Sequence, residues 1–485
     1  MPTDAIRDLR PAGLWRRFAE LSGVPRESKH EKAAGDFVAG IARNRSLSHV
    51  RDRHGNVVVR KPASPGLERR PSVCLQSHLD MVCVKRSGVA HDFAKDPIRL
   101  VRNGDVVGAD GTTLGADNGI GVAACLALMD EADLVHGPLE LLFTVDEETG
   151  LTGARRLAPD VLTSRILINL DTEDEGVLCV GCAGGQDTIG TWELHGEAVT
   201  AGMVAVSVQV SGLRGGHSGT EIHQGRGNAI KLLARMLVRL GDFGARVVRS
   251  EGGSKRNAIP AEAAALVVVP NTKLDGALAA AAELVEVLRD ELRVPEPALR
   301  IQVVRSPARP SRTWPRRLQR QLLQVLSGLP HGVVRMSAEI AGLVGTSTNV
   351  AVLRQTNERI TLATSQRSLA ASELAEIAGA VQAILELGGA TVGRGDPYPG
   401  WKPNPESHVL GIAIRTYQEL FGRDPKVEAV HAGLECGIIG ERYPGMDMVS
   451  LGPTIRDAHS PAECVDIPSV GRFWDYLLAI LENVE

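Results

Sequence analysis

Residues 139–150, LELLFTVDEETG, join a short apolar run directly to a cluster of acidic residues. The run at 139–145 has the length and composition of a buried strand, and the acids follow where that strand would end. Other strand-like runs lie at 57–60, 72–77 and 165–170, and helical patterns lie around them at 12–44, 118–133 and 153–159. This alternation predicts an α/β fold with a mixed sheet flanked by helices.

The middle of the chain, residues 186–395, has a different pattern. The run VAVSVQVSGL (204–213) alternates like a half-buried strand and precedes an amphipathic helical segment at 228–240. A similar series follows the Pro- and Arg-rich connector at 306–317, and we interpret it as a second, weakly related α/β sandwich in tandem with the first. We therefore expect one catalytic α/β domain built from residues 1–185 and 396–485, with residues 186–395 inserted as a separate domain that an internal duplication would explain.

The composition excludes several classes of function. The 485 residues are 43% hydrophobic and 23% charged, which is the balance of a soluble globular protein. A net charge of −4 gives no general attraction to nucleic acids or acidic membranes, so we expect neither as a partner. The first 21 residues carry charges where a signal peptide needs an apolar stretch, and no window reaches the roughly 18 apolar residues of a membrane span. The chain is predicted to be cytoplasmic.

The seven cysteines are sparse, and most lie within apolar runs, which favours buried, reduced thiols. Cys179 and Cys182 form a CxxC pair, the spacing of some redox and zinc sites. No second CxxC is present to complete a zinc cage, so a structural role in the core is the preferred interpretation.

Five short segments place acids or histidines just after strands or at turns: SHLDM (77–81), GADNG (115–119), VDEETG (145–150), LDTEDEG (170–176) and DAHSP (457–461). Ligands of open α/β sheets bind beyond the carboxyl ends of the strands. Three separate strands would deliver His78, the pair Glu147 and Glu148, and Asp171 to one rim. This convergence is a more specific sign of a functional site than any one of the segments alone.

Imidazole and carboxylate groups in this number suit a site for two divalent ions, namely zinc, manganese or cobalt. One carboxylate must then bridge ions about 3.5–4 Å apart, and Asp117 is the best candidate because its Gly-flanked turn permits close approach. Asp117 could instead be a plain N-cap for the helix that follows. Asp80 would orient the His78 ring, and one of the adjacent Glu147 and Glu148 could bind metal while the other accepts a proton from water. His459 on its own could be a surface histidine.

The ordered series HLDM, GADNG, DEETG, LDTEDEG and HSP resembles the M20 metallopeptidase family. Longer segments are similar to one group within it, the bacterial aminoacyl-histidine dipeptidases, also called Xaa-His dipeptidases or peptidase D. These segments are HDFAKDPI (91–98), ADGTTLGADNGIG (109–121), GCAGG (181–185), GGHSG (215–219), RNAIP (256–260), PGW (399–401), HAGLECG (431–437) and MDMVSLGPT (446–454). Two departures, Ser77 before the histidine and Thr149 after the acid pair, remove no candidate ligand.

The resemblance implies a zinc-peptidase α/β domain with an inserted lid domain. It implies that His78, Asp117 and Asp171 hold one ion, that Asp117, Glu148 and His459 hold the other, that Glu147 is the general base and that Asp80 supports His78. In the expected lid, His217 would stabilise the developing oxyanion, while Asn257 and Arg367 would contact polar ends of the substrate. Glu435 would face the free amino group of the substrate.

The function expected on these grounds is hydrolysis of dipeptides, Xaa-His types such as β-alanyl-histidine included, by a water bridging two metal ions. The substrate is then a small peptide and the ions are zinc first, with manganese or cobalt as alternatives. An M20 amidohydrolase acting on N-acyl amino acids or another small amide is the alternative within enzymes, and a binding protein without turnover is the alternative outside them. Monomer and homodimer are both open, as is whether His217 acts in its own chain.

Overall fold

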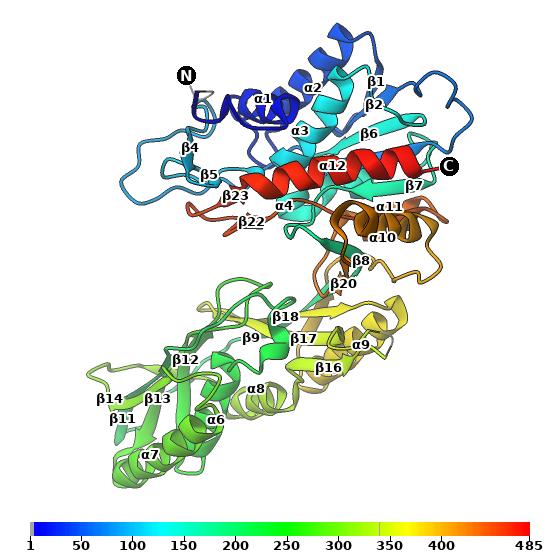
Figure 1. The fold of residues 1–485 in the computed structure, drawn as a ribbon. Coiled ribbons are helices and arrows are strands. Elements are labelled where there is room, and N and C mark those ends of the chain that lie inside the picture. The colour runs from blue at the N-terminus through cyan, green and yellow to red at the C-terminus, as the bar shows by residue number, and fades with distance from the viewer. Residues whose placement is uncertain (1–3, 339) are drawn as a thin grey trace. The chain divides into compact units, whose positions relative to one another are not determined.

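The computed structural model describes residues 4–338 and 340–485 of the chain. These residues form two compact units. Unit 1 comprises Met1–Gly181, Trp401–Ala429 and Leu434–Glu485, and unit 2 comprises Cys182–Gly400 and Val430–Gly433. In the colours of Figure 1, unit 1 combines the blue and cyan start of the chain with its orange and red end, and unit 2 is mainly green and yellow. The sequence-based limits at 185 and 395 did not anticipate the short return of residues 430–433 to unit 2.

The main sheet of unit 1 has the strand order β1-β2-β6-β3-β7-β21-β8-β20. Its strands are β1 (Ser48–Arg51), β2 (Val57–Lys61), β3 (Val73–His78), β6 (Leu139–Thr144), β7 (Ile166–Asn169), β8 (Val177–Cys182), β20 (Lys426–Val430) and β21 (Asp447–Ser450). The central strands β6, β3, β7 and β21 are parallel, while β1, β2 and β8 pair antiparallel to their neighbours. The predicted mixed sheet is confirmed, and the carboxyl ends of its parallel strands meet at one edge.

Both faces of the central strands β3, β6 and β7 are buried. Alternate residues such as Val73, Leu75 and Leu141 join a core with the helices α1 (Ala12–Leu21), α2 (Lys32–Asn44), α3 (Ala116–Asp130), α10 (His408–Phe421) and α12 (Ile467–Asn483). The intervening Cys74 and Leu142 are fully buried too, as expected for strands whose side chains alternate between two covered faces. On unit 1 lie also α4 (Glu147–Gly150), α5 (Thr152–Arg156), α11 (Glu435–Arg442) and a small sheet of β4 (Leu100–Asn103), β5 (Val106–Ala109), β22 (Ile455–Arg456) and β23 (Cys464–Asp466).

Unit 2 contains two sandwiches of the same topology. The first has the sheet order β14-β11-β13-β12, from β11 (Met203–Ser211), β12 (Arg246–Gly252), β13 (Ala263–Pro270) and β14 (Arg300–Arg305), with helices α6 (Ala229–Gly241) and α7 (Leu274–Glu291). The second has the order β17-β18-β9-β19, from β9 (Gly184–Glu193), β17 (Val344–Gln355), β18 (Arg359–Ser368) and β19 (Thr391–Arg394), with α8 (Arg316–Gly328) and α9 (Ala371–Leu387). Each is a βαββαβ unit, and the edge strands β12 and β17 join them at Gly252 and Leu353.

The tandem arrangement expected for these sandwiches is wrong, because one is nested in the other. Strand β9 precedes the whole first sandwich in the chain, yet it pairs along its full length with β18 of the second. The sequence of β9, GGQDTIGTWE, has no continuous apolar run, so its strand character depends on its partner rather than on local pattern.

The described helices include none that combines the length and the apolar character needed to cross a membrane.

Candidate metal centre

The carboxyl ends of the parallel strands carry the candidate metal ligands of unit 1. His78 is the last residue of β3, Glu147 and Glu148 open α4 directly after β6, and Asp171 follows the end of β7. The backbone is left-handed at Asp146 (φ 53°) and at His459 (φ 64°), a conformation that is uncommon for non-glycine residues, although Asp and His adopt it more readily than most.

Asp117 lies between two histidines from opposite ends of the chain. Its Oδ1 atom is 3.0 Å from Nε2 of His78, and its Oδ2 atom is 3.0 Å from Nε2 of His459. His78 Nε2 is also 3.4 Å from Oδ1 of Asp171, while His459 Nε2 is 3.0 Å from Oε2 of Glu148. The five side chains thus form two groups of three that share Asp117.

The five side chains surround one space rather than two separate sites. One ligand atom each from His78, Asp117 and Glu148 lie within 4.8 Å of one another, although His78 and Glu148 belong to different groups of three. A single shared space is what a pair of ions about 3.5–4 Å apart requires.

The charges of this cluster fit a divalent cation. Among the ion pairs of the described residues, Asp117, Glu148 and Asp171 face imidazoles, and no Lys or Arg reaches them. Burial raises the pKa of Glu148 and of Asp171, and Oε1 of Glu148 is buried without a hydrogen-bond partner. Hydrogen bonds to Asp117 and Glu148 raise the pKa of His459 to about 11. Three carboxylates that pair with imidazoles, and with no Lys or Arg at ion-pair distance among the described residues, form a donor set that zinc, manganese or cobalt would satisfy.

Asp80 contacts both His78 and the segment that carries Glu147. Its Oδ1 atom lies 3.4 Å from Nδ1 of His78, which leaves Nε2 of that ring to face the other ligands. The two Asp80 oxygens also accept hydrogen bonds from the backbone N–H groups of Glu147, at 3.0 Å, and Glu148, at 3.1 Å. Burial opposes the charge on Asp80, but the bonds to His78 and to these N–H groups outweigh it and lower its pKa to about 2. A charged Asp80 therefore fixes two parts of the site.

Glu147 lies beside the candidate ligands, and no ion pair of the described residues joins it to a histidine. Burial raises its pKa well above the ordinary range, and the neighbouring charges of Asp171, Glu148 and Glu435 raise it further. A carboxylate beside the candidate ligands that belongs to neither group of three is a candidate for the general base.

Glu435, at the start of α11, is buried against the sheet. Its Oε2 atom accepts hydrogen bonds from Nε2 of Gln76 and from Oγ1 of Thr144, both at 2.6 Å, while its Oε1 atom is buried without a partner. Burial raises the pKa of Glu435 to about 8. The polar contacts continue from Gln76 to Asn169 on β7, at 2.5 Å, so a buried network lies beneath the strand ends.

The other three predicted site residues lie in unit 2. His217 follows β11, and its Nδ1 atom accepts a hydrogen bond from the backbone N–H of Thr220 at 3.1 Å. Asn257 is exposed after β12, and its carbonyl accepts a hydrogen bond from the N–H of Ser218 at 2.8 Å, so the segments of His217 and Asn257 lie side by side. Arg367 is buried in β18, where its Nη1 atom donates to the hydroxyl of Tyr398 at 2.9 Å.

A histidine of unit 2 was not predicted as a site residue. His431 is buried, and its Nε2 atom is 2.7 Å from Oγ of Ser347. Burial, together with the charges of Arg367 and His217, lowers its pKa to about 3. His431 therefore lies in the same electrostatic neighbourhood as Arg367 and His217. His431 is the first residue of the segment HAGLECG (431–437), of which only Glu435 was predicted as a site residue.

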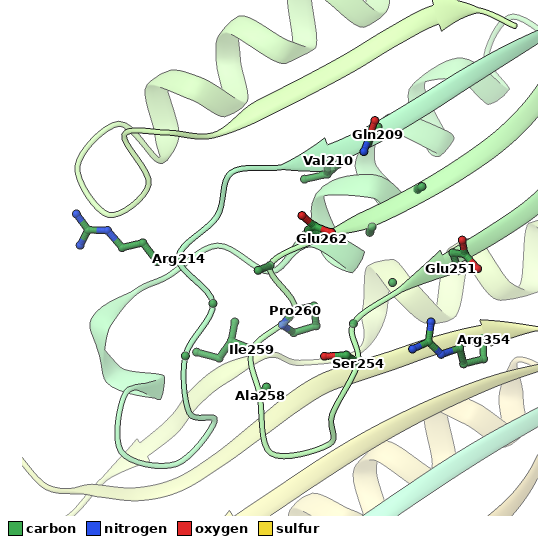
Figure 2. Close-up of a pocket in the computed structure, with 17 residues that line it drawn as sticks. Gln209, Val210, Arg214, Glu251, Ser254, Ala258, Ile259, Pro260, Glu262 and Arg354 are labelled. Atoms are coloured by element: carbon green, nitrogen blue, oxygen red, sulfur yellow. The ribbon is translucent and has the colours of Figure 1, made fainter. Parts of the chain in front are cut away.

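A pocket of about 570 Å³ opens on the first sandwich of unit 2. Figure 2 shows charged side chains around it, among them Arg214, Glu251, Glu262 and Arg354. Its wall includes Gly216 and Ala258, the chain neighbours of His217 and Asn257, but none of the predicted site residues. Two residues of the pocket wall are thus chain neighbours of candidate substrate-binding residues, while the candidate metal ligands lie in unit 1.

Comparison with known proteins identifies the family. The sequence matches the model of peptidase family M20/M25/M40 over residues 74–483. The chain belongs to this family of peptidases and is a hydrolase, which confirms the resemblance found in its motifs.

Proteins that match over nearly the whole chain include two dipeptidases. The chain is 41% identical over 480 residues to the cytosol non-specific dipeptidase of Escherichia coli (strain K12), and the match covers 99% of each sequence. It is similar to the crystal structure of aminoacylhistidine dipeptidase from Vibrio alginolyticus, with a TM-score of 0.88, 41% identity and coverage of 99% of this chain and 98% of that one. A tripeptidase from Staphylococcus aureus, at a TM-score of 0.58 and 17% identity over 98% of this chain and 99% of that one, shares the fold.

Proposed function

We propose that this chain hydrolyses dipeptides that have a free amino terminus, Xaa-His dipeptides included, with two divalent ions, zinc in the first place and manganese or cobalt as substitutes. The observation that carries the proposal is the position of Asp117, whose two carboxylate oxygens each lie 3.0 Å from a different histidine. The names of two similar proteins, a non-specific dipeptidase and an aminoacylhistidine dipeptidase, support the substrate class and leave the preference for histidine open.

The ligand sets are His78, Asp117 and Asp171 for one ion, and Asp117, Glu148 and His459 for the other. Bound there, the ions would polarise the scissile carbonyl and make a water more acidic. Glu147 takes a proton from the attacking water and returns it to the leaving amine, because it lies beside the ligands and belongs to neither ligand set. Asp80 holds the His78 ring and the start of α4 in place throughout.

The substrate's two ends require opposite charges. Arg367 is a buried guanidinium that can hold the terminal carboxylate with two parallel hydrogen bonds, and Asn257 would add a polar contact. Glu435, with one oxygen unpartnered, would receive the ammonium group, and His217 would stabilise the oxyanion. Residues 186–395 would then act as a lid that supplies substrate-binding groups. As its whole-length relative is a cytosol enzyme, we place this activity in the cytoplasm.

The test is a panel of free dipeptides, tripeptides and N-acyl amino acids, assayed on metal-stripped protein after zinc, manganese or cobalt is added back. Dipeptides should be cleaved fastest, and no substrate should be cleaved before metal is restored. Preferential cleavage of N-acyl amino acids would instead support the alternative M20 amidohydrolase. Glu435→Gln separates the two further, because loss of an ammonium-facing acid should lower kcat/KM for free dipeptides more than for N-acylated substrates.

A further inference from the structure

We infer that Glu463 is a positioning residue for Asp117: its buried carboxylate holds the turn that places the shared ligand between His78 and His459. This inference rests on the metal-bridging role proposed for Asp117. Glu463 is 3% exposed, and it lies four residues after His459 in the chain.

The Glu463 carboxylate binds four successive backbone N–H groups. Its Oε2 atom accepts from Leu114 at 2.7 Å and Gly115 at 2.9 Å, and its Oε1 atom accepts from Ala116 at 2.8 Å and Asp117 at 3.3 Å. The first N–H groups of a helix have no partner within the helix and attract negative charge, so a carboxylate is stable there. Here the partner comes from a segment 346 residues away from Asp117.

The turn at Asp117 needs such an external partner because its backbone departs from helical geometry. Asp117 has φ −77° and ψ 112°, so the helix is kinked at this residue, although the N–H of Gly119 still donates to the carbonyl of Gly115 at 3.2 Å. The four hydrogen bonds from Glu463 add to this one and help to fix where Asp117 lies.

A buried arginine holds the same turn from the other side. The Arg26 guanidinium donates to the carbonyl of Gly115 and, through Nη1, to the carbonyls of Leu79 at 3.1 Å and Asp80 at 3.0 Å. Gly115 is left-handed (φ 71°), and a Cβ there would contact Arg26 and Met81, so this approach requires glycine. Arg26 thus ties the turn to the segment after His78, while Glu463 ties it to the segment after His459.

The consequence is that Glu463 controls both ions through the one ligand they share. Glu463→Gln keeps the size of the side chain, but it turns one acceptor oxygen into an amide that faces N–H donors. At least one of the two pairs of hydrogen bonds is lost, and the turn must shift. Loss of such an outer contact weakens metal affinity by about 10- to 100-fold in known sites.

Glu140 offers a matched control in the same unit. It is 2% exposed, and its carboxylate accepts hydrogen bonds from the backbone N–H groups of Thr163 and Ser164, both at 2.9 Å. It stands near the amino end of β6, whereas the candidate ligands follow the carboxyl end of that strand. Glu140→Gln should disturb the fold to a comparable degree without moving Asp117.

The experiment compares Glu463→Gln, Glu140→Gln and the unmodified full-length chain. It measures zinc content and affinity by chelator competition, the absorption spectrum of the cobalt-loaded protein, and the unfolding midpoint of the metal-free protein. We expect Glu463→Gln to bind both ions about 10- to 100-fold more weakly and to change the cobalt spectrum, while Glu140→Gln binds as the unmodified chain does. If Glu463→Gln does not fold, Glu463→Asp and Glu140→Asp are compared by the same measurements.

Unchanged affinity and spectrum in the Glu463 variant would overturn the inference, and so would an equal loss in the Glu140 variant, because the effect would then be one of general stability. Failure of the unmodified chain to bind two ions would instead contradict the proposed function. The two failures are therefore distinguishable.

Discussion

His459 lies 342 residues after Asp117 in the chain, yet its Nε2 atom is 3.0 Å from Oδ2 of Asp117. The pairing joins the amino-terminal and carboxy-terminal parts of unit 1 at the centre of the candidate metal site. Any change that separates these two residues should affect metal binding before it affects the rest of the fold.

Glu147→Ala should lower turnover by about 10²- to 10⁴-fold, the usual contribution of a general base, because no other group would accept the proton of water. Metal content should stay at two ions per chain, since Glu147 belongs to neither ligand set. The measurement is kcat together with metal analysis of the same sample. Glu148→Ala is the comparison and should lose metal as well as turnover. Full activity of the Glu147 variant would show that the base is another residue.

Asp80→Asn should weaken metal affinity by about 10- to 100-fold, because an amide orients the His78 ring less strongly than a carboxylate. The control is Asp52→Asn, since Asp52 also accepts two backbone hydrogen bonds, from His54 at 2.8 Å and Asn56 at 3.0 Å, without contacting a candidate ligand. Chelator competition on both variants is the measurement. If the two variants bind metal with equal affinity, Asp80 does not contribute to the metal site.

Arg367→Lys should raise KM for free dipeptides by about 10- to 100-fold, which corresponds to a lost charged hydrogen bond of about 1.5–3 kcal/mol. The lysine keeps the charge but cannot make two parallel hydrogen bonds to a carboxylate. Dipeptide amides, which lack that carboxylate, should be affected far less. Arg354→Lys, an exposed arginine of the same unit, should leave KM unchanged. A loss that is equal for acids and amides would contradict the assignment.

Glu435 should make the stability of the metal-free protein depend on pH. Burial raises its pKa from the ordinary 4.5 to about 8, so the folded protein keeps this proton while the unfolded chain loses it. Folding therefore becomes less favourable as the pH rises from about 4.5 to about 8. Glu435→Gln removes this dependence. As the pH rises across this range, the unfolding midpoint of the variant should therefore increase relative to that of the unmodified chain. A difference that is constant with pH would show that Glu435 is ionised in the fold.

The sequence predicted the parts of the site that depend on local pattern. Apolar runs ending at His78, Glu147 and Asp171 were enough to place these residues at one edge of a parallel sheet, because strand direction determines where side chains meet. Glu463 and Arg26 could not be predicted in this way. Their contacts span 346 residues to Asp117 and 89 residues to Gly115, and neither lies in a pattern of its own.

The same distinction explains the fold of unit 2. The strand predicted at 204–213 is observed as β11 (Met203–Ser211), and the helical segment predicted at 228–240 is observed as α6 (Ala229–Gly241), because their apolar residues recur with a clear period. The nesting of one sandwich in the other depended on β9, whose glycines and polar residues become a strand only through pairing with β18. Such pairings between distant strands determine the topology. They leave no local pattern from which they could be predicted in a single sequence.

The central claim is that Asp117 bridges two metal ions, and crystals of the protein soaked with zinc test it most directly. Anomalous diffraction at the zinc edge should reveal two peaks about 3.5–4 Å apart, one on each side of the Asp117 carboxylate. His78 and Asp171 should coordinate one ion, and Glu148 and His459 the other. A single peak, or two peaks that do not share Asp117, would contradict this account.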